Sequence, residues 1–306
     1  MAKNIIFMGT PKFSVPTLKV LAKSEYNLKQ VYTQPAKKSL RGQKINPSPV
    51  EIVSKELELK VRTPSNLDSP IEYDFFKSID PYIVVVVAYG QIIPKKYLSL
   101  PEKGFINIHA SLLPKWRGAA PIQRSIMNCD KETGISIMKI EEGLDTGPYI
   151  KQIKTRIDEQ TTSKMLSEKL SILGAENILE SLSLIIKNEA IFLKQEDNEA
   201  TYAKKIKKSE SKIDWNDTAK NILSKINSLN PSPGAWFEHE ESRYKVWKAE
   251  VINLNGKVGQ IINDEFTIGC KEKSLKILEI QKEGKNKLPI SSFLAGTKIK
   301  KGTNLL

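Results

Sequence analysis

The sequence predicts an α/β protein in two parts, a domain built on a parallel sheet and a smaller β-barrel domain after it. The first part is indicated by strand-like apolar runs that alternate with segments of helical periodicity. One run, YIVVVVAYG at 82–90, is apolar on both faces, as expected of a central parallel strand covered by helices. In the last third of the chain, short strand-like segments are separated by turn signals roughly every 8–12 residues, which is typical of a small barrel or sandwich.

The elements expected in the first part follow one another in strand and helix order. The apolar runs predict strands at 4–10, 28–34, 82–90, 104–110 and 133–141. The helical spacing of apolar residues predicts helices at 11–24, 48–59, 120–130 and 162–188, the last being one long helix or two joined near Gly174. Ser48 is expected to cap the second helix, and Pro121 is expected to begin the third.

A change of composition separates the two parts. The segment 195–215 is polar and highly charged, which is typical of a linker. We therefore expect a first domain at 1–190, a linker at 191–208 and the barrel domain at 209–306. In the latter, a helix at 217–230 and a PSPG turn precede the strand-like segments AWFEHE, YKVWKAEVI, GKVGQIIN, EFTIGC and LKILEIQ.

Bulk composition excludes several classes of protein. Of the 306 residues, 40% are hydrophobic and 27% charged, as in ordinary globular proteins. The longest apolar run is far shorter than the roughly 20 residues of a membrane span, and the apolar run at the N-terminus is too short for a signal-peptide core. Cys129 and Cys270 provide neither a disulfide framework nor metal-ligand spacing. These features predict a cytoplasmic protein without a membrane contact.

The charge of the chain favours an anionic partner. The net charge is +13, and residues 200–306 carry 20 basic against 12 acidic side chains. Because the basic residues are mostly lysine, genomic base composition is an alternative cause. Charge alone therefore leaves RNA binding open.

The segment NIHASLLPKWRGAAPIQ at 107–123 holds the first candidate site. Alternation along the strand at 104–110 places Asn107 and His109 on one face at its carboxyl end, where open α/β sheets bind ligands. Asp145 follows in the loop EEGLDTGP. A core histidine, a turn asparagine and a turn aspartate remain the structural alternatives. There is no dinucleotide-binding glycine motif, P-loop, nucleophile elbow or histidine pair with metal-ligand spacing, so the nucleophile is expected to belong to the substrate.

Three segments resemble the 10-formyltetrahydrofolate-dependent formyltransferases in their residues, order and spacing. They are IIFMGTPKFSVPTL at 5–18, NIHASLLPKWRGAAPIQRS at 107–125 and EEGLDTGP at 141–148. Within that superfamily, MGTPKFSVP and RGAAPIQR are similar to the methionyl-tRNA formyltransferases, as are residues 213–237 and 244–249. The resemblance implies a Rossmann-like parallel-sheet formyltransferase domain joined to a small, OB-like C-terminal β-barrel.

The resemblance also implies a reaction without a metal. The formyl group of 10-formyltetrahydrofolate would pass to the α-amine of methionyl initiator tRNA, for translation initiation. Asn107 and protonated His109 would stabilise the oxyanion, while Asp145 would orient the imidazole, favour its charged form and accept the amine proton. The expected folate-binding turn is formed by Ser111, Leu112, Leu113 and Pro114.

A basic loop at 34–50 is the expected tRNA contact of the first domain. It carries four cations and no acid, and its glycine and prolines disfavour a helix. The four cations are Lys37, Lys38, Arg41 and Lys44. The resemblance matches Arg41 to the key arginine of the family's loop, although this chain reads KKSL where the family often has Arg-Pro-x-Gly. A solvated surface loop is the alternative.

Three other functions are alternatives. A sugar-nucleotide N-formyltransferase would share the Asn107, His109 and Asp145 core, but the basic loop and the basic barrel disfavour it. Glycinamide ribonucleotide formyltransferase is typically shorter and lacks the barrel. A catalytically silent RNA-binding protein would not need these three residues. We expect the protein to act as a monomer.

Overall fold

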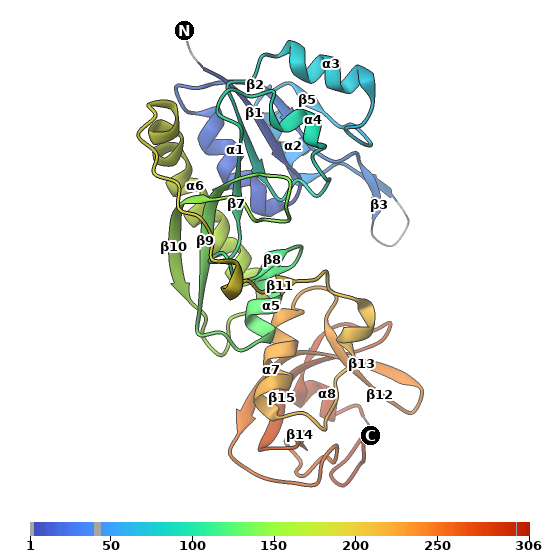
Figure 1. Cartoon of the computed structure of the whole chain (residues 1–306). Coiled ribbons are helices and arrows are strands. Elements are labelled where there is room, and N and C mark those ends of the chain that lie inside the picture. Colours follow the sequence, from blue (N-terminus) through green and yellow to red (C-terminus); the bar gives the residue numbers. More distant parts are fainter. Residues whose placement is uncertain (1–2, 40–43, 298) are drawn as a thin grey trace. The chain divides into compact units, whose positions relative to one another are not determined.

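The computed structural model describes residues 3–39, 44–297 and 299–306 (Figure 1). The chain forms two compact units. The first unit contains residues 1–118, 134–155 and 167–202, and the second contains 119–133, 156–166 and 203–306. Each unit is described by itself below.

The first unit is built on a seven-stranded sheet in the order β10-β9-β7-β6-β1-β2-β5. Its strands are β1 (Asn4–Gly9), β2 (Asn27–Tyr32), β5 (Val61–Arg62), β6 (Ile83–Val87), β7 (Phe105–His109), β9 (Glu132–Lys139) and β10 (Tyr149–Arg156). The pairings from β5 to β7 are parallel, whereas β9 runs antiparallel to β7. The expected parallel sheet is thus extended by an antiparallel strand. The sequence did not predict this direction, because apolar periodicity does not report it.

Helices flank this sheet. They are η1 (Lys12–Ser14), α1 (Val15–Ala22), α2 (Pro49–Glu56), α3 (Pro70–Ser78), α4 (Lys95–Leu98) and α6 (Ser163–Ile186). The predicted cap is confirmed, since Ser48 Oγ accepts from the Glu51 N–H at 2.9 Å. The helix predicted at 162–188 is the single helix α6. A Cβ at Gly174 would lie 2.9 Å from Ile108 Cγ2, so the glycine lets α6 approach β7 closely.

Side-chain alternation in β7 separates the core from the candidate site. Ile108 faces α6. On the opposite face, Phe105 joins an apolar cluster with Val86 of β6 and Phe76 of α3. Because Asn107 and His109 alternate with the isoleucines, they lie on the same face as Phe105.

The backbone around the basic loop is more regular than predicted. Residues Lys37–Ser39 form β3 and Lys44–Asn46 form β4, which pair as an antiparallel hairpin. The sequence predicted a flexible loop here, because its glycine and prolines are turn residues. Arg41 lies outside the described residues.

The second unit contains a five-stranded antiparallel sheet. Strands β12 (Ala235–His239), β13 (Ser242–Ile252), β15 (Ser274–Lys282) and β14 (Thr267–Gly269) follow in this order, and β16 (Leu288–Pro289) pairs with β15. Its helices are α5 (Pro121–Met127), η3 (Lys208–Ser211), α7 (Ala219–Ser228) and α8 (Ile290–Leu294). Within the described chain, the predicted strand GKVGQIIN makes only isolated bridges, such as Ile261 with Ile268.

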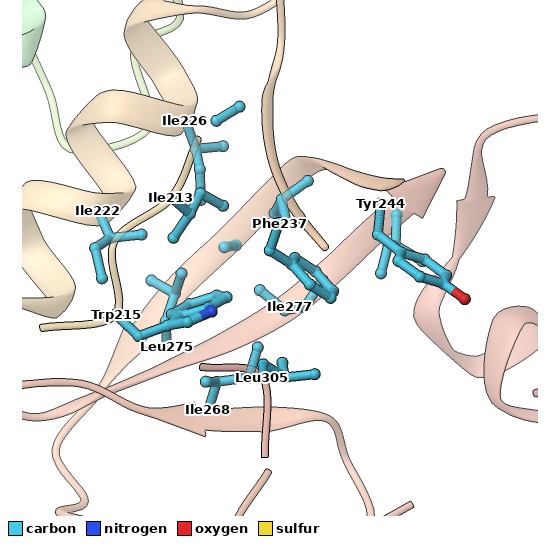
Figure 2. Packing of buried hydrophobic residues seen from close by; sticks show 14 of the residues in the cluster. Ile213, Trp215, Ile222, Ile226, Phe237, Tyr244, Ile268, Leu275, Ile277 and Leu305 are labelled. Carbon is cyan, nitrogen blue, oxygen red and sulfur yellow. The ribbon is translucent and has the colours of Figure 1, made fainter. Parts of the chain in front are cut away.

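One apolar core holds the second unit together. Figure 2 shows Trp215, Phe237, Ile277 and Leu305 gathered between α7 and the strands. Trp215 and Phe237 meet edge to face with ring centroids 5.8 Å apart. This packing gives the second unit its own hydrophobic core.

Three short elements remain, one shortly after β7 and two in the polar segment at 195–215. They are β8 (Arg117–Gly118), η2 (Asp197–Glu199) and β11 (Tyr202–Ala203). Residues 191–202, part of the segment predicted as a linker, lie in the first unit.

Candidate functional site

His109 stands at the carboxyl end of β7 and is 6% exposed. Its Nε2 lies 3.0 Å from the carbonyl oxygen of Trp116, and its Nδ1 lies 3.6 Å from Asp145 Oδ2. Both facing atoms are acceptors. A ring protonated on both nitrogens can therefore donate toward both, and the ring is held between a dipole and a charge.

Asp145 is fixed by a backbone donor and by its own loop. Its Oδ2 accepts from the Gly118 N–H at 2.8 Å. Its backbone has φ of 51°, the left-handed region that is uncommon for residues other than glycine. At Gly147, a Cβ would collide with the carbonyl oxygen of Lys139, so glycine is needed where the loop meets the end of β9.

Asn107 lies two residues before His109 on the same face of the sheet. Its backbone is in register with Val86 of β6 and Met138 of β9, so the position is central in the sheet. Its half-buried side-chain amide makes no hydrogen bond within the described part of the chain. An amide held at a strand end without a protein partner is available to donate to a ligand.

The turn Ser111–Pro114 is rigidly built. Ser111 and Leu113 are buried, whereas Leu112 and Pro114 are half-buried. The buried hydroxyl of Ser136 accepts from the Leu113 N–H at 3.0 Å and donates to the Ser111 carbonyl at 2.7 Å. The turn therefore presents its second and fourth side chains, while the first and third fix its shape.

Sequence reasoning missed the residues that surround the histidine and the aspartate. The Trp116 carbonyl contacts the His109 ring, and the Gly118 N–H donates to the Asp145 carboxylate. Gln195 donates to the Asp145 carbonyl at 2.7 Å. The sequence held a signal for Trp116 and Gly118, because they lie two and four residues after the SLLP turn. Gln195 carried no such signal, since its segment has the composition of a linker.

The basic residues proposed for tRNA are placed only in part. The backbones of Lys37 and Lys38 belong to β3, and that of Lys44 belongs to β4. Arg41 is not among the described residues. The backbones of three of the four basic residues thus belong to one hairpin.

The described residues contain neither a metal-binding cluster nor a membrane-spanning helix. No group of three or more His, Cys, Asp or Glu side chains could hold a metal ion among them. None of their helices is both long enough and apolar enough to cross a membrane.

Comparison with known families gives the class of the protein. Residues 3–182 match the family model described as formyl transferase, and residues 205–298 match the formyl transferase C-terminal domain. The fold and the site thus define a formyl transferase with a C-terminal antiparallel domain.

Curated relatives narrow the class. The chain is 53% identical over 307 aligned positions to the methionyl-tRNA formyltransferase of Pelagibacter ubique (strain HTCC1062), covering 100% of this chain and 99% of the relative. It is 42% identical to that of Caldanaerobacter subterraneus subsp. tengcongensis, covering 99% of both. The chain belongs to the methionyl-tRNA formyltransferase family.

Solved structures support the fold. A methionyl-tRNA formyltransferase from Clostridium thermocellum has a TM-score of 0.58 at 20% identity, covering 82% of this chain and 94% of that one. An N-formyltransferase from Helicobacter canadensis has a TM-score of 0.69 at 20% identity, covering 90% of this chain and 99% of that one. At these identities the likeness concerns the fold alone.

Proposed function

We propose that this chain transfers a formyl group from 10-formyltetrahydrofolate to the α-amine of methionyl initiator tRNA, and that Asn107, His109 and Asp145 act on the reacting atoms. Formyl transfer is the activity of the family. The observation that carries the assignment to these residues is the His109 ring, held between the Asp145 carboxylate and the Trp116 carbonyl. Two residues earlier on the same strand, the Asn107 amide makes no hydrogen bond within the described part of the chain.

The chemistry requires charge stabilisation and two proton movements. The amine nitrogen bonds to the formyl carbon, and negative charge develops on the formyl oxygen. The Asn107 amide donates to this oxygen, an interaction worth roughly 3–4 kcal/mol in comparable sites. The amine proton passes to Asp145, directly or through water. The oxyanion then re-forms the carbonyl as the bond from carbon to N10 breaks, and N10 takes up the proton held by Asp145, directly or through water.

His109 contributes through its positive charge and its Nε2 proton. Nε2 donates to the Trp116 carbonyl in this structure. A hydrogen bond to the formyl oxygen therefore requires that this proton be shared or exchanged. Asp145 compensates the charge of the ring from the Nδ1 side.

We propose that the folate binds at the turn Ser111–Pro114. Leu112 and Pro114 present apolar surface suited to a ring system, while buried Ser111 and Leu113 hold the turn. The Helicobacter canadensis N-formyltransferase, which shares the fold, was solved in complex with folinic acid. These observations support a folate donor at this turn.

The tRNA contacts are assigned to two places. Lys37, Lys38 and Lys44 of the hairpin, and Arg41 between them in the sequence, are proposed to bind acceptor-stem phosphates. The basic barrel domain would bind phosphates further along the tRNA. We assign catalysis to residues 1–190, the connection to 191–208 and the barrel to 209–306. The two family models, at 3–182 and 205–298, support a boundary between two domains, although residues 191–202 lie in the first compact unit. The protein would act as a cytoplasmic monomer.

The acceptor is tested with the purified chain and 10-formyltetrahydrofolate. Methionyl initiator tRNA, methionyl elongator tRNA and an amino-sugar nucleotide such as dTDP-3-aminofucose are compared at equal concentration. The proposal predicts product on the initiator tRNA. Product only on the sugar nucleotide would assign the chain to the other branch of the superfamily, and no product on any acceptor would favour an RNA-binding protein.

A further inference from the structure

A buried arginine lies directly beside the catalytic pair. Arg117 is 2% exposed. Its Nε donates to Gln195 Oε1 at 2.9 Å, and its Nη2 donates to Asp197 Oδ1 at 2.7 Å. Since an unpaired buried charge is costly, these two acceptors are required, and together they tie the segment 195–197 to β8.

Gln195 uses its amide to hold the loop that carries Asp145. Its Nε2 donates to the carbonyl oxygens of Asp145 and Gly147, both at 2.7 Å. Only one orientation of the amide satisfies all partners, because Arg117 needs an acceptor and the two carbonyls need donors. Asp145 has a left-handed backbone, a conformation that persists only where its surroundings enforce it.

The backbone on both sides of Arg117 contacts the same catalytic pair. The Trp116 carbonyl accepts from His109, and the Gly118 N–H donates to Asp145. The segment is held from outside as well, because the N–H groups of Trp116 and Arg117 donate to the Oγ1 and the carbonyl of Thr201 at 2.9 Å each. One arginine thus connects the backbone that holds His109 with the glutamine that holds Asp145.

We infer that Arg117 and Gln195 are positioning residues that set the separation between His109 and Asp145. Neither is placed to touch the reacting atoms in this account. They act by fixing the two backbone segments from which the imidazole and the carboxylate are held. The inference rests on the proposed function, because it presupposes that Asp145 acts on the reaction through its distance from His109.

The test compares two glutamines of the first unit. Gln195→Met keeps the length of the side chain and removes its hydrogen bonds. Gln30→Met is the matched control, because the buried Gln30 also donates from Nε2 to two carbonyls, those of Val31 and Lys60, away from the site. We expect Gln195→Met to lower kcat roughly 10- to 100-fold with KM unchanged for both substrates, as misplacement of a catalytic group does. The control should lose thermal stability without losing kcat.

A double variant separates positioning from structure. If Gln195 acts through Asp145, Gln195→Met should change kcat less than about twofold in the Asp145→Asn background. The ¹⁵N resonances of the His109 ring, observed with His239 replaced by glutamine, should move in Gln195→Met but not in Gln30→Met. If Gln195→Met does not fold, Gln195→Asn, which is too short to reach both partners, takes its place.

Two results would overturn the inference while leaving the proposed function intact. One is equal kcat in Gln195→Met and Gln30→Met, with Asp145→Asn strongly impaired. The other is an undiminished effect of Gln195→Met in the Asp145→Asn background. An Asp145→Asn variant with wild-type kcat would overturn both the role of Asp145 and the inference built on it.

Discussion

Replacing Asp145 by asparagine keeps the size of the side chain but removes its charge and with it the proposed acceptor of the amine proton. The amide oxygen of Asn can still accept from the Gly118 N–H, so the loop should keep its conformation. Across 3.6 Å, the charge on Asp145 and a charged His109 attract each other by about 4–5 kcal/mol at an effective dielectric constant of about 20. Because the carboxylate is 19% exposed, water screens part of this attraction, and we expect about 2–3 kcal/mol of it to remain.

The loss of this attraction alone predicts a roughly 30- to 150-fold lower rate of formyl transfer in Asp145→Asn, and loss of the proton acceptor lowers the rate further. The assay is single-turnover formylation of methionyl initiator tRNA with enzyme in excess, alongside KM for the folate and thermal unfolding. Asp74→Asn, on the exposed side of α3, removes the same charge away from the site and should leave the rate unchanged. A folded Asp145→Asn variant within about threefold of the wild-type rate would refute the electrostatic argument.

Three further predictions concern the turn, the hairpin and the barrel domain. Ser136→Ala leaves the Leu113 N–H without its acceptor, so stability should fall by about 1–3 kcal/mol and KM should rise for the folate but not for the tRNA. Arg41→Ala should weaken tRNA binding, measured by filter binding at several salt concentrations, far more than folate binding. The Arg124 guanidinium hydrogen-bonds to Glu210 and lowers the pKa of that carboxyl. Wild type should therefore be more stable than Glu210→Gln above about pH 4.5, and chemical unfolding should show this difference vanish as pH falls through the lowered pKa.

Periodicity predicted the parts of the fold that burial dictates. The run at 82–90 became the central strand β6, buried on both faces, and alternation in β7 correctly separated Ile106 and Ile108 from Asn107 and His109. Both results follow because an apolar pattern encodes which side of an element is covered. The same pattern is silent on strand direction, so the antiparallel pairing of β9 was not predicted.

The surroundings of the site could be predicted less well than its members. Trp116 contributes a carbonyl and Gly118 contributes an N–H, and backbone groups are the same in every residue. Gln195 reaches Asp145 from a distance of 50 positions in the chain, within a polar segment whose composition resembles a linker. Such contacts depend on tertiary arrangement. The position of Trp116 and Gly118 shortly after the SLLP turn was the local signal for the first two, and Gln195 had none.

The two histidines of the chain allow the most direct test of the central claim. His109→Gln and His239→Gln make the same substitution, one at the end of β7 and one in β12 of the other unit. In single-turnover transfer from 10-formyltetrahydrofolate to methionyl initiator tRNA, the account predicts a loss of at least about 100-fold for His109→Gln and a wild-type rate for His239→Gln. Equal rates in the two folded variants would contradict it.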